Sequence, residues 1–119
     1  MSSIHLRIVV YPETPRTWTA RLLEHDLSAV GRSIELATGA VLKLAMAHIV
    51  YDRRHQHKPL SVFAAAPALY WTAFKQATPL PLASEIACSG DECVVQVNAA
   101  VLARHPAVTA YVPCFTRGA

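Results

Sequence analysis

Residues 18–37 read WTARLLEHDLSAVGRSIELA and hold the start of a sheet and of a helix. Apolar and polar residues alternate from Trp18 to Leu22, which predicts a strand that is buried on one face. A second, shorter strand is expected over Leu27–Val30. Gly31 ends it, because glycine adopts backbone angles that are costly for other residues. The stretch therefore predicts two neighbouring strands followed at once by another element.

That next element is a long helix. Ser33 is a good N-cap, and Glu35 in the first turn suits the positive end of the helix dipole. From Ile34 to His48 apolar residues recur at three-and-four spacing, and further apolar positions widen the stripe. We therefore expect the helix to be buried on more than one side. The basic run from Arg53 to Lys58 lies at the expected C-terminal end, where Pro59 prevents continuation.

The N-terminal segment Ile4–Tyr11 also alternates, and it predicts a half-buried strand that pairs with residues 17–22 across a short proline-containing turn. Together with residues 27–30, these segments predict an antiparallel sheet of three strands backed by the long helix. The expected fold class is α+β. Strand parity places Trp18 and Ala20 toward the core beneath that helix.

The second half of the chain predicts one more helix and a strand-rich extension. Pro67 fits the first turn of a helix in which aromatic residues keep helical spacing. We expect a single domain, with a core over residues 1–82 and a C-terminal extension over residues 83–119. The expected elements of the extension are strands near residues 84–88, 93–97 and 108–115 and a short helix capped by Asn98.

Composition describes a compact chain with sparse charge. Hydrophobic residues make up 53% of the 119 residues and charged residues 16%, which excludes a disordered chain. The longest apolar run is interrupted by Pro67 and is too short to span a membrane, and no signal-peptide pattern opens the chain. Three cysteines form no disulfide framework, which is typical of a reducing compartment. We expect a cytoplasmic location and no membrane partner.

The order of residues in the opening stretch resembles a known family pattern. An aromatic residue precedes an Asp-Leu step, and a glycine, a hydroxyl residue, an acid and an alanine then open a helix. This arrangement is similar to that of HicB-like antitoxins. A second likeness, to stand-alone members of that family, lies in Ala66-Pro67 followed by Tyr70, Trp71 and Phe74. The first likeness is carried by Trp18, Thr19, Ala20, Leu23, Asp26, Leu27, Gly31, Ser33, Glu35 and Ala37.

The resemblance implies a truncated ribonuclease H-like fold, in which three antiparallel strands are backed by a helix, and it implies self-association. Antitoxins of this family usually carry a C-terminal helix-turn-helix or ribbon-helix-helix segment that binds DNA. Residues 84–119 are instead expected to form strands, so we do not expect DNA binding. The family also implies a small protein partner, such as a toxin.

No side-chain pattern indicates catalysis, a metal site or a cofactor. The eight acidic residues fall in expected turns, caps and loops, whereas two-metal nucleases need carboxylates that converge. His48 and Asp52 share a helix face, but the histidines nearby do not match zinc-binding spacings. Cys88 and Cys93 flank an expected turn, and we expect both to stay reduced.

Two classes of function follow from these observations. The leading hypothesis is a non-enzymatic HicB-like module that binds a protein and forms a homodimer or tetramer, because its apolar surface exceeds what one sheet and two helices cover. Its candidate interface residues are Tyr70, Trp71 and Phe74. The alternative is an RNA-binding or nuclease-related domain, motivated by the net charge of +3. The candidate contacts of this alternative are Arg53, Arg54, His55 and Lys58.

Overall fold

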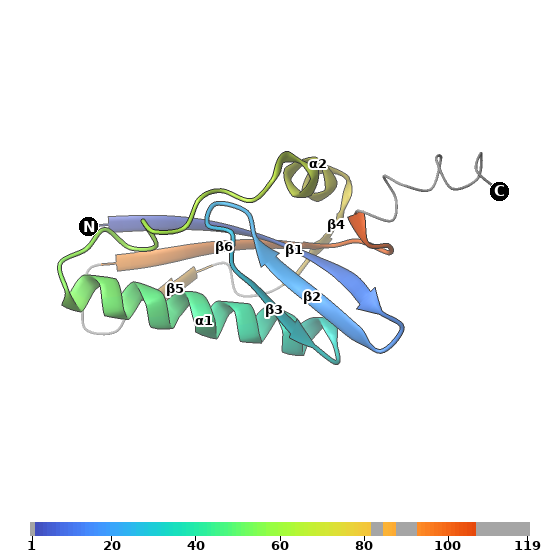
Figure 1. Cartoon of the computed structure of the whole chain (residues 1–119), viewed down its shortest axis with the longest axis horizontal. Coiled ribbons are helices and arrows are strands. Elements are labelled where there is room, and N and C mark those ends of the chain that lie inside the picture. The colour runs from blue at the N-terminus through green and yellow to red at the C-terminus, as the bar shows by residue number, and fades with distance from the viewer. Residues whose placement is uncertain (1, 82–84, 88–92, 107–119) are drawn as a thin grey trace.

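The computed structural model describes residues 2–81, 85–87 and 93–106, and Figure 1 shows how their elements are arranged. Three strands are followed by two helices and then by three further strands. The elements are β1 (Ser2–Thr14), β2 (Thr17–Leu22), β3 (Ser28–Gly31), α1 (Ile34–Arg54), α2 (Ala68–Gln76), β4 (Thr78–Leu80), β5 (Glu85–Ala87) and β6 (Cys93–Val101). The strand expected near residues 108–115 lies outside the described residues.

These strands form one mixed sheet in the order β3-β2-β1-β6-β4, and β5 also pairs with β6. β1, β2 and β3 form antiparallel pairs, as the sequence predicts. β6 lies beside β1 and runs parallel to it, in a register that pairs Ile4 with Val95 and Val10 with Val101. The α+β class is therefore confirmed, but the prediction of a three-stranded antiparallel sheet is wrong.

The segment predicted as a C-terminal extension supplies an inner strand of this sheet. β6 contains Asn98, which therefore lies within a strand and does not cap a helix. Val95 and Val97 are buried on the face toward α1, and Ala100 is buried on the opposite face. Gln96 and the exposed Asn98 share that opposite face, so the described side chains of β6 are apolar along the side toward α1 and buried on the other side only near Ala100.

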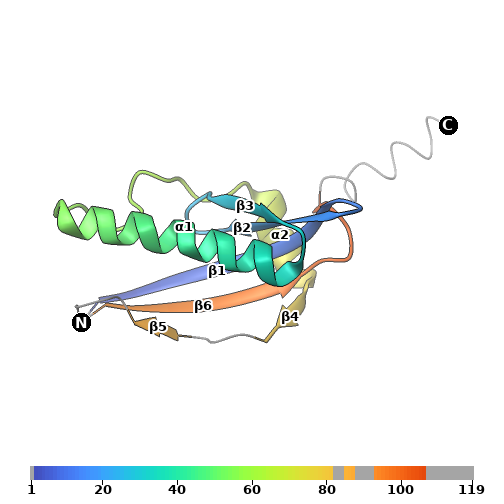
Figure 2. The same cartoon turned by 90° about the horizontal axis from the view of Figure 1, so that it is seen from below.

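Helix α1 covers one face of the sheet, mainly over β1, β2 and β3, as Figures 1 and 2 show. The apolar residues that alternate in β1 and β2 pack here against those at three-and-four spacing in α1, as expected. Trp18 packs at the margin of this core and remains partly exposed. The buried residues of this core are Leu6, Ile8, Val10, Ala20, Leu22, Leu27, Ala37, Val41, Ala45, Ile49, Leu60, Val95, Val97 and Ala99.

The opposite face of the sheet is covered by α2 and the segment before it (Figure 1). Val9 and Tyr11 are buried there beside Leu23 and Ala66. β1 is therefore buried on both faces over residues 8–11, whereas His5 and Arg7 are exposed, so the expectation of a half-buried strand is wrong only for its later part. The amide of Ala66 donates to the Leu23 carbonyl at 2.8 Å, which holds the start of α2 against the sheet.

The turn between β3 and α1 depends on close backbone contact. Gly31 does not lie in the left-handed region, so the expected reason for a glycine here is wrong. A Cβ atom on Gly31 would instead lie 2.5 Å from the backbone nitrogen of Ala37. Ser33 is the N-cap, as predicted, and its hydroxyl accepts from the amide of Leu36 at 3.0 Å. Only glycine lets the end of β3 approach the first turn of α1 this closely.

The end of α1 is held by Asp52 rather than by Pro59. Asp52 is buried, and its carboxylate accepts from the amide of Leu60 at 2.8 Å. Its carbonyl also accepts from the amide of His57 at 2.7 Å. Leu60 has a φ of 60°, which is costly for a leucine, yet its side chain is fully buried in the core. Asp52 therefore stabilises the tight connector that leaves the helix.

Candidate protein-binding surface

The side of α1 that faces away from the sheet is apolar and uncovered. Residues on its inner side are buried against the sheet, whereas Leu36 is 62%, Tyr51 56% and Leu44 37% exposed. Ala40 and Ala47 lie between these large residues along the helix. We call these five residues, together with Lys43, the α1 surface.

The apolar character continues along one flank of the helix. Leu42, Met46 and Val50 are only partly buried, and with Lys43 and Ala47 they line a shallow apolar depression. By length and composition alone α1 is apolar enough to cross a membrane, a test that the core helix of a water-soluble protein also passes. A helix that is apolar on all sides is normally covered on all sides. In the described part of the chain, the sheet covers only one side of it.

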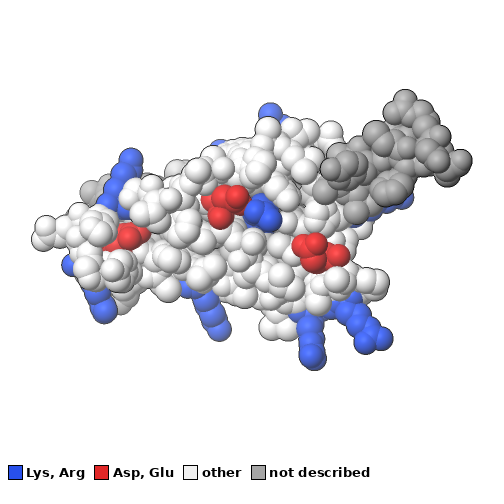
Figure 3. All heavy atoms as spheres, in the orientation of Figure 1, with Lys and Arg blue, Asp and Glu red and all other residues white. Residues whose placement is uncertain are grey.

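Basic side chains project in a row along the α1 side of the molecule (Figure 3). Lys43 and Arg54 lie eleven residues apart, or three helical turns and about 16 Å. Arg32 is exposed just before the N-cap. Glu35, also exposed, is the acidic residue in the first turn of α1. Helix α1 therefore has two opposite charges, Arg32 and Glu35, at its N-terminal end, whereas its C-terminal end is basic.

The aromatic residues predicted as an interface pack against the chain's own sheet. Tyr70, Trp71 and Phe74 are partly buried over the second face, where the rings of Tyr70 and Tyr11 stack at 5.8 Å. The indole nitrogen of Trp71 donates to the Ala66 carbonyl at 3.1 Å. None of the residues of α2 is fully buried, so each ring also keeps an exposed edge. The inner edges of these rings serve the fold of this chain.

A partly buried arginine network lies beneath α2. The Arg21 guanidinium donates to the Tyr11 hydroxyl at 3.2 Å, pairs with Asp26 at 2.6 Å and lies 4.3 Å from the centre of the Tyr70 ring. Burial raises the pKa of Tyr11 to about 12, although Arg21 opposes this shift. Burial tends to lower the pKa of Arg21, but its bonds to Tyr11 and Asp26 outweigh that effect and raise the pKa. This network fixes α2 to the sheet.

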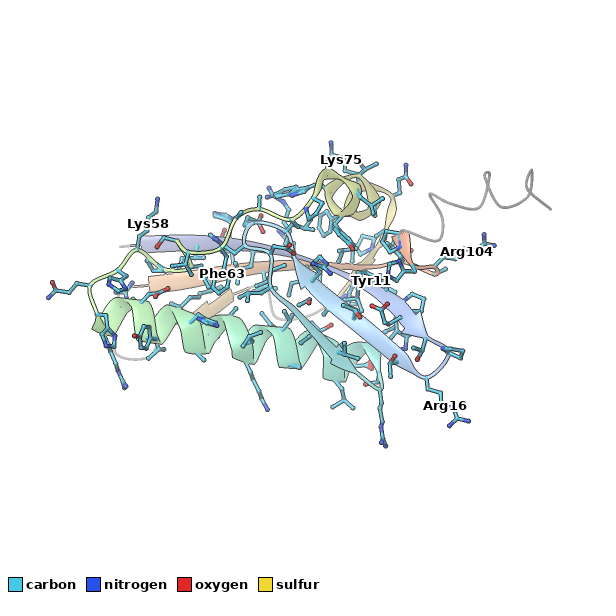
Figure 4. All side chains as sticks on the ribbon, viewed as in Figure 1. Tyr11, Arg16, Lys58, Phe63, Lys75 and Arg104 are labelled. Carbon is cyan, nitrogen blue, oxygen red and sulfur yellow. The ribbon has the colours of Figure 1, made fainter. Side chains whose placement is uncertain are left out.

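The predicted basic cluster is located at the C-terminal end of α1. Arg54, His55 and Lys58 are exposed, and Arg53 is partly buried. The ring of His55 stacks on Tyr51 at 4.1 Å, and its Nδ1 lies 2.8 Å from the Tyr51 carbonyl oxygen. Lys58 projects away from the helix, from the connector that follows it (Figure 4). The cluster is therefore a set of side chains around a helix end rather than a lined groove.

Most of the described acidic side chains are engaged within the fold. Glu24 pairs with Arg7, Asp26 with Arg21, and Asp52 caps the amide of Leu60. Glu13 lies in β1 rather than in the turn where it was expected, and it accepts from the Thr19 hydroxyl at 2.8 Å. Within residues 2–81, 85–87 and 93–106, no three His, Cys, Asp or Glu side chains gather to hold a metal ion. The side chains of Cys88 and Cys93 lie outside the described part.

The sequence interpretation did not name the α1 surface as the interface. The signal was present, because Leu36, Leu44 and Tyr51 already widen the helical stripe beyond one face. The sequence could not show which side of the helix the sheet covers. No family model, curated protein or solved structure matches this chain.

Proposed function

We propose that this chain is a non-enzymatic protein-binding module that self-associates through the α1 surface. The observation that carries the proposal is the exposure of Leu36, Leu44 and Tyr51 on one helix. Contiguous exposed apolar patches on soluble proteins commonly mark interaction sites. A second apolar area, around Val9 and Tyr11, is covered by α2 within the chain. The α1 surface is therefore the better candidate for the interface.

The HicB-like resemblance supports this proposal through the residues that carry it. Gly31 and Ser33 join β3 to α1 by close contact and capping, and Asp26 holds Arg21 beneath α2. The strands β1, β2 and β3 form antiparallel pairs, and α1 packs on them. These residues serve the scaffold, which fits a module that acts by binding. An antitoxin-related role with a small protein partner follows from the resemblance alone.

Light scattering after size exclusion tests the proposed self-association. We expect the unmodified chain at micromolar concentration to show a mass near two or four times 13.0 kDa. The double variant Leu36→Glu, Leu44→Glu should return to a single-chain mass, because charge replaces the apolar contact. Val62→Glu is the matched control, since Val62 is 78% exposed but lies in the connector. A single-chain mass for the unmodified protein would overturn self-association.

A second candidate is RNA binding at the C-terminal end of α1. Arg54, His55 and Lys58 are exposed there together, and the net charge of the chain is +3. Phosphate contacts weaken steeply as salt rises, so fluorescence anisotropy with labelled single- and double-stranded RNA at two salt concentrations tests this candidate. Binding that falls with salt and is lost on Lys58→Glu supports it. Equal binding by the variant excludes this cluster as the contact.

A further inference from the structure

We infer that the α1 surface pairs with the α1 surface of a second copy of this chain. The two helices run antiparallel about a two-fold axis, and their Lys43 side chains face each other across it. The inference rests on the proposed function and specifies the partner and the geometry of that interface. It is carried by the order of apolar and charged residues along the exposed side of one helix.

The apolar residues of the α1 surface are arranged symmetrically about the middle of the helix. Leu36 and Tyr51 lie equally far from the point between Lys43 and Leu44, and so do Ala40 and Ala47. In an antiparallel pair centred on that point, Leu36 of one copy therefore meets Tyr51 of the other. Ala40 meets Ala47 in the same way, and a two-fold axis repeats each contact.

The sizes of these residues suit such a pair. The two alanine contacts lie nearer the axis, so the helix backbones approach closely there. The leucine and tyrosine contacts lie farther out and cover the ends of the contact. Leu36 and Tyr51 are also the most exposed large apolar residues of α1, so they have the most surface to bury.

The charges at the ends of α1 favour the antiparallel orientation. The C-terminal end is basic at Arg54, whereas the charges of Glu35 and Arg32 offset each other at the N-terminal end. An antiparallel pair sets the basic end of each copy beside the balanced end of the other, whereas a parallel pair brings the two basic ends together. Charge complementarity of this kind fixes orientation more than it adds affinity.

Lys43 is the unfavourable member of the surface. It is exposed and adjoins Leu44 at the centre, so the two-fold axis brings two ammonium groups toward each other. The aliphatic part of each lysine side chain covers apolar surface, while the charged end reaches water. Repulsion between two exposed like charges weakens the pair only modestly. It also makes the geometry testable, because a charge reversed in one copy alone turns repulsion into attraction.

The experiment mixes the unmodified chain with the Lys43→Glu variant, each carrying a distinct mass label, and measures the pairs by native mass spectrometry. Each chain alone places like charges at the axis, whereas the mixed pair places opposite charges there. We therefore expect mixed pairs above their statistical share. Lys43→Gln should self-associate about two- to fivefold more tightly than the unmodified chain, because it removes the repulsion. Lys58→Glu, a charge reversal outside the α1 surface, is the matched control and should mix statistically.

The outcomes separate this inference from the proposed function. Statistical mixing of the Lys43→Glu variant, in chains that light scattering shows to be dimeric, overturns the antiparallel geometry and leaves self-association standing. A single-chain mass in every sample overturns both. Phosphatidylglycerol vesicles and a labelled single-stranded RNA serve as probes for an anionic occupant. Binding of either probe by the single chain, lost on Lys43→Glu, would show that a second copy is not what covers this surface.

Discussion

Replacing Gly31 with alanine should destabilise the fold, and the structure gives the reason. The added Cβ atom would lie 2.5 Å from the backbone nitrogen of Ala37 and 2.8 Å from the carbonyl carbon of Leu36. Both neighbours are backbone atoms of the first turn of α1, so no side-chain rotation relieves the contact. The helix must move away from the end of β3, or β3 must leave its pairing with β2, where Gly31 lies opposite Trp18.

The expected cost combines two effects. Overpacking a close contact costs about 1–3 kcal/mol. A shift of the first turn also weakens the N-cap bond from the Leu36 amide to the Ser33 hydroxyl, and a lost cap costs about 1 kcal/mol. We therefore expect Gly31→Ala to lower the free energy of unfolding by about 2–4 kcal/mol. That is a large part of the stability of a small domain.

Gly39→Ala is the matched control, because the same substitution at that position should raise the free energy of unfolding instead of lowering it. Gly39 lies inside α1, and a Cβ atom at that position meets nothing within 4 Å. Alanine in a helix interior is favoured over glycine by about 0.5–1 kcal/mol, so this variant should be stabilised. Urea titration of both variants at low protein concentration measures the two changes. A loss below about 0.5 kcal/mol for Gly31→Ala would refute the close-contact explanation, since surface changes commonly fall in that range.

Three further predictions concern the core and its polar contacts. Trp18→Ala should lower the free energy of unfolding, measured by urea titration, by about 2 kcal/mol. This is less than for a fully buried tryptophan, because the ring lies at the margin of the core. An unchanged free energy would show that the ring does not pack. Asp52→Ala should lower the free energy of unfolding by about 2 kcal/mol, because it leaves the buried Leu60 amide unpaired. Asp52→Asn retains an acceptor and should lower it less. Equal losses for the two variants would contradict this explanation. Burial raises the pKa of Tyr11 to about 12 from its ordinary value of 10.0, so its stabilising contribution is present below pH 10 and is lost as pH rises toward 12. Tyr11→Phe should flatten this fall in thermal unfolding scans, and an unchanged slope would exclude Tyr11 as its cause.

The sequence predicted those parts of the fold that depend on neighbours in the chain. The structure contains the alternating strands β1 and β2, the Ser33 N-cap and the basic last turn of α1 at Arg53 and Arg54. Each of these features depends on residues close to one another in the chain. The position of β6 depends instead on a partner about 90 residues earlier in the chain. Its apolar pattern indicates a strand, but it does not identify the neighbour. The parallel pair of β1 and β6 could therefore not be predicted from local patterns.

The candidate site shows the same division. The sequence correctly indicated that α1 is apolar on several sides, but burial depends on where the sheet lies, and no local pattern states this. The rings of Tyr70 and Phe74, four residues apart, follow helical spacing in the same way as Leu36 and Leu44, eight residues apart, do in α1. The structure distinguishes the two sets, because the first pair packs on the sheet and the second is exposed. Helical spacing alone cannot separate an interface from a core.

The distribution of apolar residues explains why α1, rather than α2, is left with surface to cover. α2 has nine residues and lies over a face where Tyr11 and Arg21 already meet its rings. α1 has 21 residues and packs on the sheet with its inner side, whereas Leu36, Leu44 and Tyr51 on its outer side are exposed. A long apolar helix in that position loses stabilising burial along its whole length unless another chain supplies it. Within the chain, β6 and α2 therefore bury part of the hydrophobic residues that the sequence has in excess. The remainder lies on α1, in the symmetric order that a second copy of the same helix can match.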